Sequence, residues 1–403
     1  MHILMLSDQH AESAGGVQVS IRLQTKFLER AGHTVTVCAP RMHAAHAHDP
    51  HDVDTRSLPI TLDREYSASL PGRRTDAELD RAMASRPPVD VVHVQADFWQ
   101  AIIGYRFAER HGLPVVHTFH NHVEFGIEHV VSAPRLAVRA MLWAQRRVLR
   151  PRMSRLAPSA WSYLDEFALR ASALVAPSRH FAELLESKGV GSDIAVVSTG
   201  VDDDLVDDVR SGSGDGARTA ERPRPVFLWM GRMSAEKRLM EFLEAVRLSG
   251  ADAEFRLYGA GLLLSKARAF VERHGLGDRV VFAGRVPYRE SLRAMADADA
   301  LVQTSIGFET QGMTVFEATV MGTPSIVSDP AVAAELPGDV IRQPTDGSVA
   351  ALASALSETV TAITRGELSR VAEERGRAYL QSTQTERMVA IYERVVAREH
   401  GEG

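Results

Sequence analysis

The chain has 403 residues, more than one ordinary hydrophobic core holds, so we expect two domains. Its net charge of −6 excludes a globally basic nucleic-acid-binding protein. The single cysteine, Cys38, excludes an intrachain disulfide and a cysteine-rich zinc site, and it fits a reducing cytoplasm. The start "MHILMLSD" predicts a first strand rather than a signal peptide, and without a run of 18 apolar residues we expect no membrane span.

Short apolar runs alternate with amphipathic helical stretches along the whole chain, a pattern that predicts parallel sheets covered on both faces. The runs predicted as strands lie at 2–6, 34–39, 89–94, 114–119, 173–178 and 194–199, and then at 226–231, 254–259, 280–284, 300–305 and 324–329. Helices are predicted at 17–32, 237–250 and 385–400. The fold class is therefore α/β with two halves.

Composition suggests where the halves divide. The stretch 210–225 is rich in Gly, Ser, Pro and charge and has no apolar periodicity, which is typical of an exposed linker. We expect an N-terminal domain over 1–205, a linker over 206–225, a C-terminal domain over 226–383 and a final helix within 384–403 that packs back on the N-terminal domain.

Two loops that follow predicted strands suit an anion. In "AGGVQ", residues 14–18, glycines precede a helix whose N-terminus offers free N–H groups, although a plain strand-to-helix turn explains the pair as well. In "GRMSAEKR", residues 231–238, Arg232 and Lys237 are two cations at the edge of a parallel sheet and suit a diphosphate; two solvated surface cations are the alternative. "YGAG", at 258–261, repeats the strand-to-glycine pattern.

The block "GFETQGMTVFEATVMGTPSIVSD", residues 307–329, places one glutamate before a predicted helix and one inside it. The helix is predicted over 312–321, so Glu309 lies in the preceding loop and Glu317 lies about one and a half turns inside. A carboxylate can accept hydrogen bonds from neighbouring sugar hydroxyls, and a helix N-terminus suits a phosphate. The block therefore indicates a nucleotide-sugar site, with a capping glutamate plus a surface glutamate as the alternative.

These motifs, with "GGVQ", "VSTGVD", "GRMSAEKR", "LYGAG" and "FAGRVP" in this order along the chain, resemble the family 4 retaining glycosyltransferases. The resemblance implies the GT-B fold, in which two Rossmann-like parallel-sheet domains face each other across a cleft. Within it, the "ETQGMT" form of the block resembles diacylglycerol glucosyltransferases, a subgroup similar to phosphatidylinositol mannosyltransferases. One departure is Thr199, where the family usually has an asparagine before Gly200.

The resemblance implies roles for individual residues. The catalytic set is His120 near the anomeric centre, Arg232 and Lys237 on the diphosphate, and Glu309 on the hydroxyls of the donor sugar. Glu317 matches the carboxylate that binds the ribose. The other substrate-binding residues implied are Gly15, Gly16, Gly259, Arg285, Val286, Gln311, Gly312, Met313 and Thr314. The family uses no catalytic metal, so no cofactor is expected.

Histidines gather in two places, and neither pattern favours a metal site; in the first, no carboxylate pattern of a metal site joins the histidines. "HTFHNH" contains His117, His120 and His122, and strand alternation predicts that His120 and His122 lie on one side, away from His117. The second cluster, "RMHAAHAHDPHD" at 41–52, is typical of a solvated polar loop.

The stretch "RLAVRAMLWAQRRVLRPRMSR", residues 135–155, has seven arginines, no Asp or Glu, and apolar residues at helical spacing. A basic amphipathic helix with a tryptophan suits an anionic membrane surface. The alternative is a helix that packs its apolar face on the sheet and solvates its arginines. The first interpretation favours a lipid acceptor and a peripheral position at the inner face of the cell membrane.

The sequence thus predicts a retaining hexosyltransferase with UDP-glucose as the preferred donor, GDP-mannose as the second choice, and a lipid such as diacylglycerol as acceptor. A transferase acting on a soluble small molecule or an exopolysaccharide unit is the alternative within enzymes. A non-catalytic sugar-nucleotide-binding protein is less favoured because the four charged residues Arg232, Lys237, Glu309 and Glu317 are all present. No nucleic-acid partner is expected, and the sequence leaves the oligomeric state open.

Overall fold

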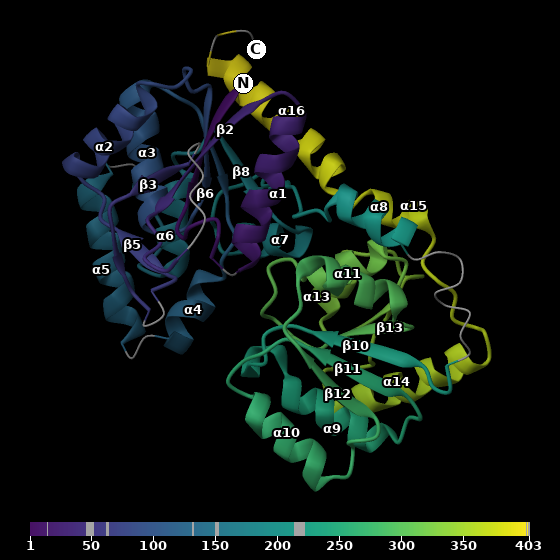
Figure 1. Ribbon diagram of the computed structural model, residues 1–403. Coiled ribbons are helices and arrows are strands. Elements are labelled where there is room, and N and C mark those ends of the chain that lie inside the picture. Colours follow the sequence, from purple (N-terminus) through teal and green to yellow (C-terminus); the bar gives the residue numbers. More distant parts are fainter. Residues whose placement is uncertain are drawn as a thin grey trace. The chain divides into compact units, whose positions relative to one another are not determined.

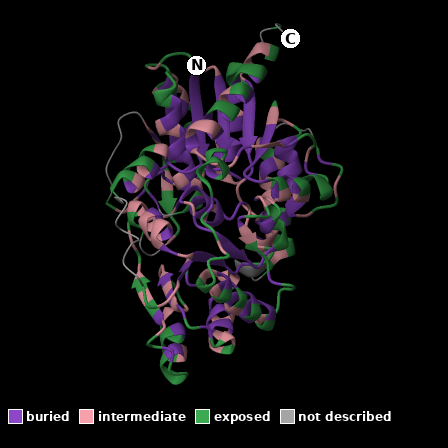
Figure 2. Cartoon of the chain, turned by 90° about the vertical axis from the view of Figure 1, so that its right-hand side faces the viewer, coloured by how far each residue is buried: buried purple, intermediate pink, exposed green. Residues whose placement is uncertain are grey.

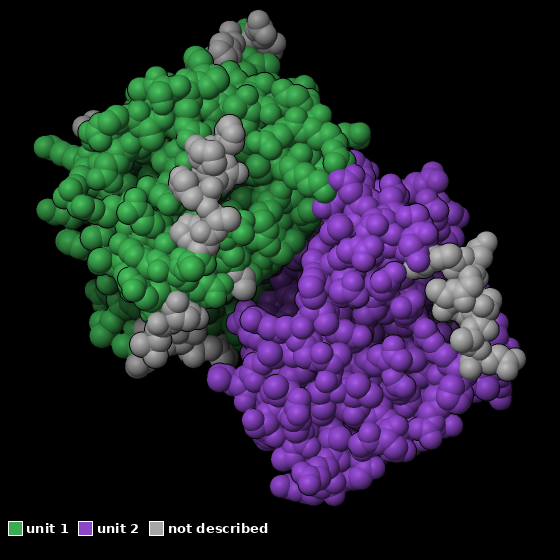
Figure 3. All heavy atoms as spheres, viewed as in Figure 1, with its two compact units in different colours: residues 1–199, 384–403 green, residues 200–383 purple. Residues whose placement is uncertain are grey.

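The computed structural model describes residues 1–13, 15–45, 52–61, 64–130, 133–149, 153–212, 222–399 and 401. The chain forms two compact units (Figures 1 and 3). Unit 1 comprises residues 1–199 and 384–403, and unit 2 comprises residues 200–383. Each unit is an α/β sandwich around its own parallel sheet, as the alternating sequence pattern predicted.

Unit 1 contains a seven-stranded parallel sheet in the order β3-β2-β1-β6-β7-β8-β9. Its strands are β1 (His2–Ser7), β2 (Thr34–Pro40), β3 (Val53–Thr55), β6 (Val91–Gln95), β7 (Val115–Thr118), β8 (Ala173–Ala176) and β9 (Ala195–Val196). A separate antiparallel hairpin pairs β4 (Ser57–Pro59) with β5 (Ser67–Ser69). The short strands β3, β4 and β5 were missed in the sequence because three residues carry too little periodicity to detect.

Helices cover both faces of this sheet, so its strands are buried (Figure 2). Along β1, Ile3 and Met5 face one layer while Leu4 and Leu6 face the other, as strand alternation requires. The first layer contains α1 (Gly16–Arg30) and α16 (Gln381–Glu399). The helices between β5 and β9 are α2 (Arg73–Met83), α3 (Trp99–His111), α4 (Val123–Val130), α5 (Pro134–Val148), α6 (Ala160–Ala168) and α7 (Arg179–Ser187). Helix α16 contributes to the core of unit 1 through Met388, Ile391, Tyr392 and Val395. In the sequence, residues 200–383 of unit 2 separate these side chains from the rest of unit 1.

Unit 2 contains a six-stranded parallel sheet in the order β12-β11-β10-β13-β14-β15. The strands are β10 (Val226–Met230), β11 (Glu254–Tyr258), β12 (Val280–Gly284), β13 (Ala300–Gln303), β14 (Ser325–Val327) and β15 (Ile341–Arg342). Its helical elements are α8 (Asp203–Gly212), the 3-10 turn η1 (Ala235–Lys237), α9 (Leu239–Ser249), α10 (Leu264–Arg273), α11 (Tyr288–Asp297), α12 (Met313–Val320), α13 (Pro330–Ala333), α14 (Val349–Thr364) and α15 (Glu373–Arg377). Phe227 and Trp229 face a core shared with α9 and α14, and Leu228 faces the core shared with α8, α11 and α12.

Two expected boundaries differ from the structure. The division between the units lies at 199/200 rather than at 205/206. Residues 206–212 are the end of α8 rather than linker, because Val206 and Val209 are buried in the core of unit 2. Of the expected linker, residues 213–221 lie outside the described part of the chain.

Candidate functional site

Strand order predicts where each unit binds a ligand. In an open parallel sheet the crevice forms at the carboxyl ends of the strands, at the point where the order of the strands reverses. In unit 2 that point lies between β10 and β13, which are neighbours in the sheet but far apart in sequence. In unit 1 it lies between β1 and β6. The connections that follow β1, β10 and β13 contain Arg232, Lys237, Glu309 and the predicted residues at 15–16 and 311–317. His120, Gly259, Arg285 and Val286 follow the neighbouring strands β7, β11 and β12.

In unit 2 the loops after β10, β11 and β12 are joined by backbone hydrogen bonds. Gly231 N–H donates to Tyr258 O at 3.1 Å, and Gly259 N–H donates to Gly284 O at 2.8 Å. Gly259 has φ 133°, and a Cβ on it would lie 1.9 Å from Gly231 O. Only glycine therefore allows the first two loops to approach this closely, which explains the glycine of the "YGAG" motif.

The two predicted charged residues Lys237 and Glu309 lie in direct contact. Lys237 Nζ donates to Glu309 Oε1 at 2.5 Å, and Ser305 Oγ donates to the same oxygen at 2.7 Å. Thr304 Oγ1 in turn donates to Lys237 O at 2.6 Å and holds η1 against the end of β13. The lysine also lies over the Phe308 ring, 5.3 Å from its centroid. The carboxylate and ammonium are only 13% and 24% exposed, so this pair is shielded but still reachable from solvent.

The two predicted arginines are in a different state. Arg232 and Arg285 are exposed, and Val286 beside Arg285 is partly buried. Among the described residues, no carboxylate lies within ion-pair distance of Arg232 or Arg285. These guanidinium groups are therefore available to an anion that approaches the loop edge, as a bidentate fork requires.

The start of α12 matches its prediction to within one residue. Gly312 is the N-cap with φ 83°, and a Cβ there would lie 3.0 Å from Val332 Cγ1. Gln311 and Gly312 are buried, while Met313 and Thr314 are partly exposed. No side chain caps this helix end, so the first amides of α12 form a site for a polar or negatively charged group.

Glu317 lies within α12 and is buried, with 5% of its surface exposed. Burial raises the pKa of its carboxyl group to about 7, and the hydroxyl of Tyr288 opposes this rise by interacting with the carboxylate. Tyr288 is the first residue of α11 and follows the "GRVP" stretch directly. Sequence reasoning missed it, because its contact with Glu317 depends on the packing of α11 against α12.

In unit 1, Gly15 and Gly16 are exposed and begin α1, with Gly15 as the N-cap. A Cβ on Gly15 would lie 2.2 Å from the side-chain Oε1 of Gln18. Ala14, which precedes them in the motif, lies outside the described residues. The loop thus has the open backbone that a close ligand contact needs.

His120 lies just after β7 and is partly exposed. Its Nε2 is 3.0 Å from Oε1 of the buried Gln95, the last residue of β6. Burial lowers the pKa of His120 to about 4, with Asp97 raising it and His117 lowering it further. The imidazole is therefore neutral at physiological pH.

A buried polar network that the sequence did not reveal supports this region. Asp97 Oδ2 accepts hydrogen bonds from the side-chain Nδ2 of Asn121 at 2.6 Å and from its backbone N–H at 3.1 Å. His117 Nε2 lies 3.6 Å from Asp97 Oδ1, and both residues are fully buried. His117 is thus a core residue. Since β7 ends at Thr118, strand alternation does not extend to His120 or His122.

The basic stretch 135–155 forms α5, whose last residue is Val148, and residues 150–152 lie outside the described chain. Val138, Leu142 and Gln145 are buried. The opposite face exposes Leu136 (68%) and Trp143 (65%), with the Arg147 guanidinium 5.5 Å from the Trp143 ring centroid. The helix therefore has two apolar faces, of which one packs in the core and one meets solvent.

Among the described residues, no group of three or more His, Cys, Asp or Glu side chains is placed to hold a metal ion. Residues 46–51 of the His-rich loop at 41–52 lie outside them. Every helix in the described parts of the chain is too short or too polar to cross a bilayer.

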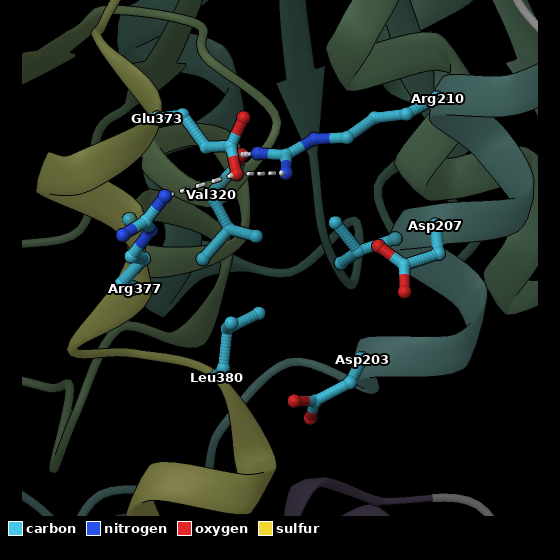
Figure 4. Close-up of a pocket in the computed structure, with 9 residues that line it drawn as sticks. Asp203, Asp207, Arg210, Val320, Glu373, Arg377 and Leu380 are labelled. Carbon is cyan, nitrogen blue, oxygen red and sulfur yellow. Dashed lines mark hydrogen bonds and ion pairs between the residues drawn. The ribbon is translucent and has the colours of Figure 1, made fainter.

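A pocket of about 150 Å³ in unit 2 is lined by residues of α8, α12 and α15 (Figure 4). Arg210 donates to the carbonyl of Val320 at 2.8 Å and pairs with Glu373 at 3.3 Å. The pocket lies at the C-terminal end of α12, whereas the candidate site lies at its N-terminus, so it is no part of that site.

Comparison with known families matches both units. Residues 14–205 match the model described as Glycosyltransferase Family 4, and residues 224–362 match the model described as Glycosyl transferases group 1.

Among curated proteins, the chain is 23% identical over 343 residues to the alpha-monoglucosyldiacylglycerol synthase of Streptococcus pneumoniae, covering 81% of this chain and 70% of that protein. It is 30% identical over 242 residues to the 2-deoxystreptamine N-acetyl-D-glucosaminyltransferase of Streptomyces fradiae, covering 58% and 53%. It is 26% identical over 250 residues to the 2-deoxystreptamine glucosyltransferase of Streptomyces kanamyceticus, covering 59% of each chain.

Solved structures show the same fold. Anabaena HepE in complex with UDP superposes with a TM-score of 0.69 at 16% identity, over 98% of this chain and 100% of that one. Sucrose-phosphate synthase from Thermosynechococcus elongatus gives 0.68 at 18% identity, over 99% and 100%. Together with the two strand orders, these similarities confirm the predicted GT-B class with two Rossmann-like parallel-sheet domains.

Proposed function

The chain belongs to the family 4 glycosyltransferases and transfers a sugar from a nucleotide sugar, and from this premise we propose that it moves glucose from UDP-glucose to a lipid acceptor with retention of anomeric configuration. The proposed donor site is supported by the contact between Lys237 and Glu309 at the switch point of unit 2. The proposed lipid acceptor is supported by the exposed face of α5, which is both apolar and basic.

The donor half of the proposal assigns each group by its chemistry. Arg232 and Lys237 hold the diphosphate, Glu309 binds hydroxyls of the sugar, and Glu317 binds the ribose. The amides at the start of α12 and the loop at Gly259 contribute N–H donors, and Arg285 and Val286 lie where the base is read. UDP is supported as the nucleotide because HepE was solved with UDP and with UDP-glucose. GDP-mannose stays the second choice.

In this proposal, catalysis is mainly electrostatic. The bond between the anomeric carbon and the β-phosphate oxygen breaks, and the acceptor oxygen forms its bond on the same face of the sugar. The departing phosphate oxygen takes the proton of the acceptor hydroxyl, so UDP and the glycoside are the products. Arg232 and Lys237 stabilise the negative charge that develops on the diphosphate, a contribution that in enzymes of this kind reaches about 10²- to 10³-fold for each donor. His120 orients the donor sugar.

In this proposal, the ion pair between Lys237 and Glu309 is exchanged for contacts with the donor when the donor binds. In the structure the ammonium group of Lys237 pairs with the carboxylate of Glu309. A diphosphate attracts the lysine while sugar hydroxyls replace it as donors to Glu309. Donor binding therefore exchanges one ion pair for two sets of contacts, which favours a ligand that carries both groups.

The acceptor half rests on α5. Leu136, Ala140, Trp143 and Arg147 lie at helical spacing on its exposed face, with Arg135 and Arg139 beside them. Trp, Leu and Arg on one face suit the interface of an anionic membrane. The diacylglycerol synthase of S. pneumoniae, matched over 81% of this chain, supports a lipid acceptor.

A soluble acceptor is the second candidate. It is favoured by the two Streptomyces relatives that are named for 2-deoxystreptamine, one of which has the higher identity of 30%. In that case α5 is a packed surface helix, and its exposed face does not bind a membrane.

We would test the proposal with the purified chain, UDP-glucose or GDP-mannose, and anionic vesicles with or without diacylglycerol. We expect glucose transfer from UDP-glucose that requires diacylglycerol. The doubly substituted variant Leu136→Asp/Trp143→Asp should lose vesicle binding about 10²- to 10⁴-fold, because two apolar side chains of roughly 1.5–3 kcal/mol each no longer enter the interface.

The matched control is Leu248→Asp, which changes a half-exposed leucine of α9 in unit 2. It should bind vesicles like the unmodified protein. Transfer to 2-deoxystreptamine without vesicles, with no transfer to diacylglycerol, contradicts the lipid assignment and supports the second candidate.

A further inference from the structure

The hydrogen-bond partner of His120 is itself held in one orientation by the core of unit 1. Gln95 ends β6 with 1% of its surface exposed, so its amide cannot turn to water. Its Oε1 lies 3.0 Å from His120 Nε2, and its Nε2 donates to Gln24 Oε1 at 3.2 Å and to Met5 Sδ at 3.5 Å. Each polar atom of the amide thus has a partner.

The methionine decides which way the amide faces. A thioether sulfur accepts hydrogen bonds but cannot donate, so the Gln95 NH₂ group belongs on the side of Met5 and the carbonyl oxygen on the side of His120. The next link agrees, because Gln24 Nε2 donates to Ser20 Oγ at 3.1 Å, which leaves Gln24 Oε1 to accept from Gln95. Reversing the amide would place its oxygen against sulfur.

This orientation determines the tautomer of His120. A carbonyl oxygen can only accept, so the ring must carry its proton on Nε2, and the neutral ring then has a lone pair on Nδ1. In the part of the chain that the structure describes, His120 Nδ1 makes no hydrogen bond. The ring is partly exposed, so this lone pair can meet a ligand.

We propose that Gln95 is a positioning residue that fixes His120 as the Nε2–H tautomer, so that Nδ1 accepts a hydrogen bond from a hydroxyl of the donor sugar. The proposal rests on the proposed function for the identity of that ligand, but the tautomer itself follows from unit 1 alone. It also ties His120 through Gln24 to α1, the helix that begins at the Gly15–Gly16 loop.

The surroundings keep the ring neutral. Burial lowers the pKa of His120 to about 4; Asp97 favours the protonated ring, and His117 and His93 are the histidines that interact with it electrostatically. A protonated ring has N–H on both nitrogens and could not accept from a sugar. The hydrogen bond proposed for Nδ1 therefore requires the neutral ring, which burial and the neighbouring His117 favour.

The direct test is the ¹⁵N chemical shifts of the imidazole nitrogens, which separate a protonated from an unprotonated ring nitrogen. The His120→Gln variant identifies the resonances of His120 among the 16 histidines. We expect one tautomer at pH 7, with the proton on Nε2, and a change at Nδ1 on adding UDP-glucose but not UDP. A proton on Nδ1, or an equal mixture, overturns the proposal.

Two substitutions at Gln95 separate positioning from mere packing. Gln95→Leu removes the acceptor, so the tautomer becomes mixed and kcat falls about 10- to 100-fold, with a small change in KM for UDP-glucose. Gln95→Glu keeps an acceptor for Nε2–H but adds a negative charge that raises the pKa of His120. Activity in this variant should therefore be lost as pH falls through the raised pKa and should recover at higher pH.

The control is Gln100→Leu, which changes another fully buried glutamine of unit 1 whose Nε2 donates to Thr55 Oγ1 at 2.7 Å. We expect it to lower stability but to leave the tautomer and the pH profile unchanged. If Gln95→Glu has the same pH profile as the unmodified enzyme, the proposal fails. If the chain transfers no sugar at all, the proposed function fails, while the tautomer measurement still decides the orientation of His120.

Discussion

The two switch points of this chain differ in how far solvent reaches their polar side chains. In unit 2, the loops after β10 and β13 present Arg232, Lys237 and Glu309, charged groups that solvent can reach. In unit 1, the polar groups that follow β6 and β7 are more shielded: the side chains of Gln95 and Asp97 are almost fully buried, and His120 is partly exposed. From this difference we expect unit 2 to hold a charged group and unit 1 to orient an uncharged one.

Each unit nevertheless contains one buried carboxyl group whose pKa is raised to a similar value. Burial raises the pKa of Asp8, at the end of β1, and of Glu317, in α12, to about 7 in each case. Asp8 accepts backbone hydrogen bonds from Asp97, Phe98 and Gln100 at 2.7 to 3.0 Å and so holds the start of α3. Glu317 interacts with the Tyr288 hydroxyl. Asp8 is thus used in the scaffold, whereas the ribose-binding role of Glu317 stays a prediction.

The largest effect should come from breaking the charged pair of unit 2. Lys237→Met should lower kcat/KM for UDP-glucose about 10²- to 10³-fold, because an electrostatic donor to the leaving diphosphate is lost. Thermal unfolding should change little, since a partly exposed ion pair contributes about 0–1 kcal/mol. Steady-state kinetics and a melting curve check both expectations.

The matched control is Lys266→Met, an exposed lysine of α10 in the same unit. It should retain full activity. A Lys237→Met enzyme as active as this control would show that the charged switch point does not act on the leaving group, and the contrast between the units would lose its functional meaning.

A second change sharpens the comparison of the two buried carboxyl groups. Their raised pKa values mean that the folded state binds more protons than the unfolded state between the ordinary carboxyl pKa and about 7. The unfolding free energy therefore falls as pH rises through this window, by about 1.4 kcal/mol per pH unit for each group. Glu317→Gln should accordingly stabilise unit 2 at pH 8 and change little at pH 4. It should also raise KM for UDP-glucose about 10- to 100-fold by removing charge-assisted hydrogen bonds.

Hydrogen exchange followed by mass spectrometry separates the units in this experiment. Amides of unit 2 should lose their pH-dependent protection in Glu317→Gln, while amides of unit 1 keep the dependence caused by Asp8. Glu272→Gln, at an exposed position of α10, serves as the control and should leave both unchanged. Equal changes in both units would contradict the assignment of the effect to Glu317.

The smallest effect should come from Ser305, which donates to the same oxygen of Glu309 as Lys237 does. Ser305→Ala removes one hydrogen bond to a charged group, worth about 1–2 kcal/mol, so kcat/KM should fall roughly 5- to 30-fold. Ser357→Ala removes a comparable hydrogen bond, from Ser357 Oγ to Ser249 O at 2.9 Å, elsewhere in unit 2. If both variants lose activity equally, the loss reflects stability rather than the orientation of Glu309.

Local sequence was sufficient for the longer strands and for the position of the candidate residues after them. The apolar runs from "HILML" to "PSIVSD" all became strands, because burial on both faces of a parallel sheet demands continuous apolar residues. Gly312 and the apolar spacing after it located α12 to within a residue, because a helix end depends on its own few residues. The linker boundary was wrong because the buried side chains of α8, Val206 and Val209, are too few to outweigh the polar composition around them.

What the sequence by itself determined is therefore the α/β class, the strand and helix positions, and which charged and glycine residues follow which strands. Tertiary structure alone decided that Lys237 contacts Glu309 across 72 residues, that Tyr288 lies beside Glu317, and that Gln95 faces His120. The physical reason is that local periodicity fixes an element through contacts with its neighbours in sequence. These pairs form only when the strand order brings the ends of distant strands together, and no local pattern specifies that order.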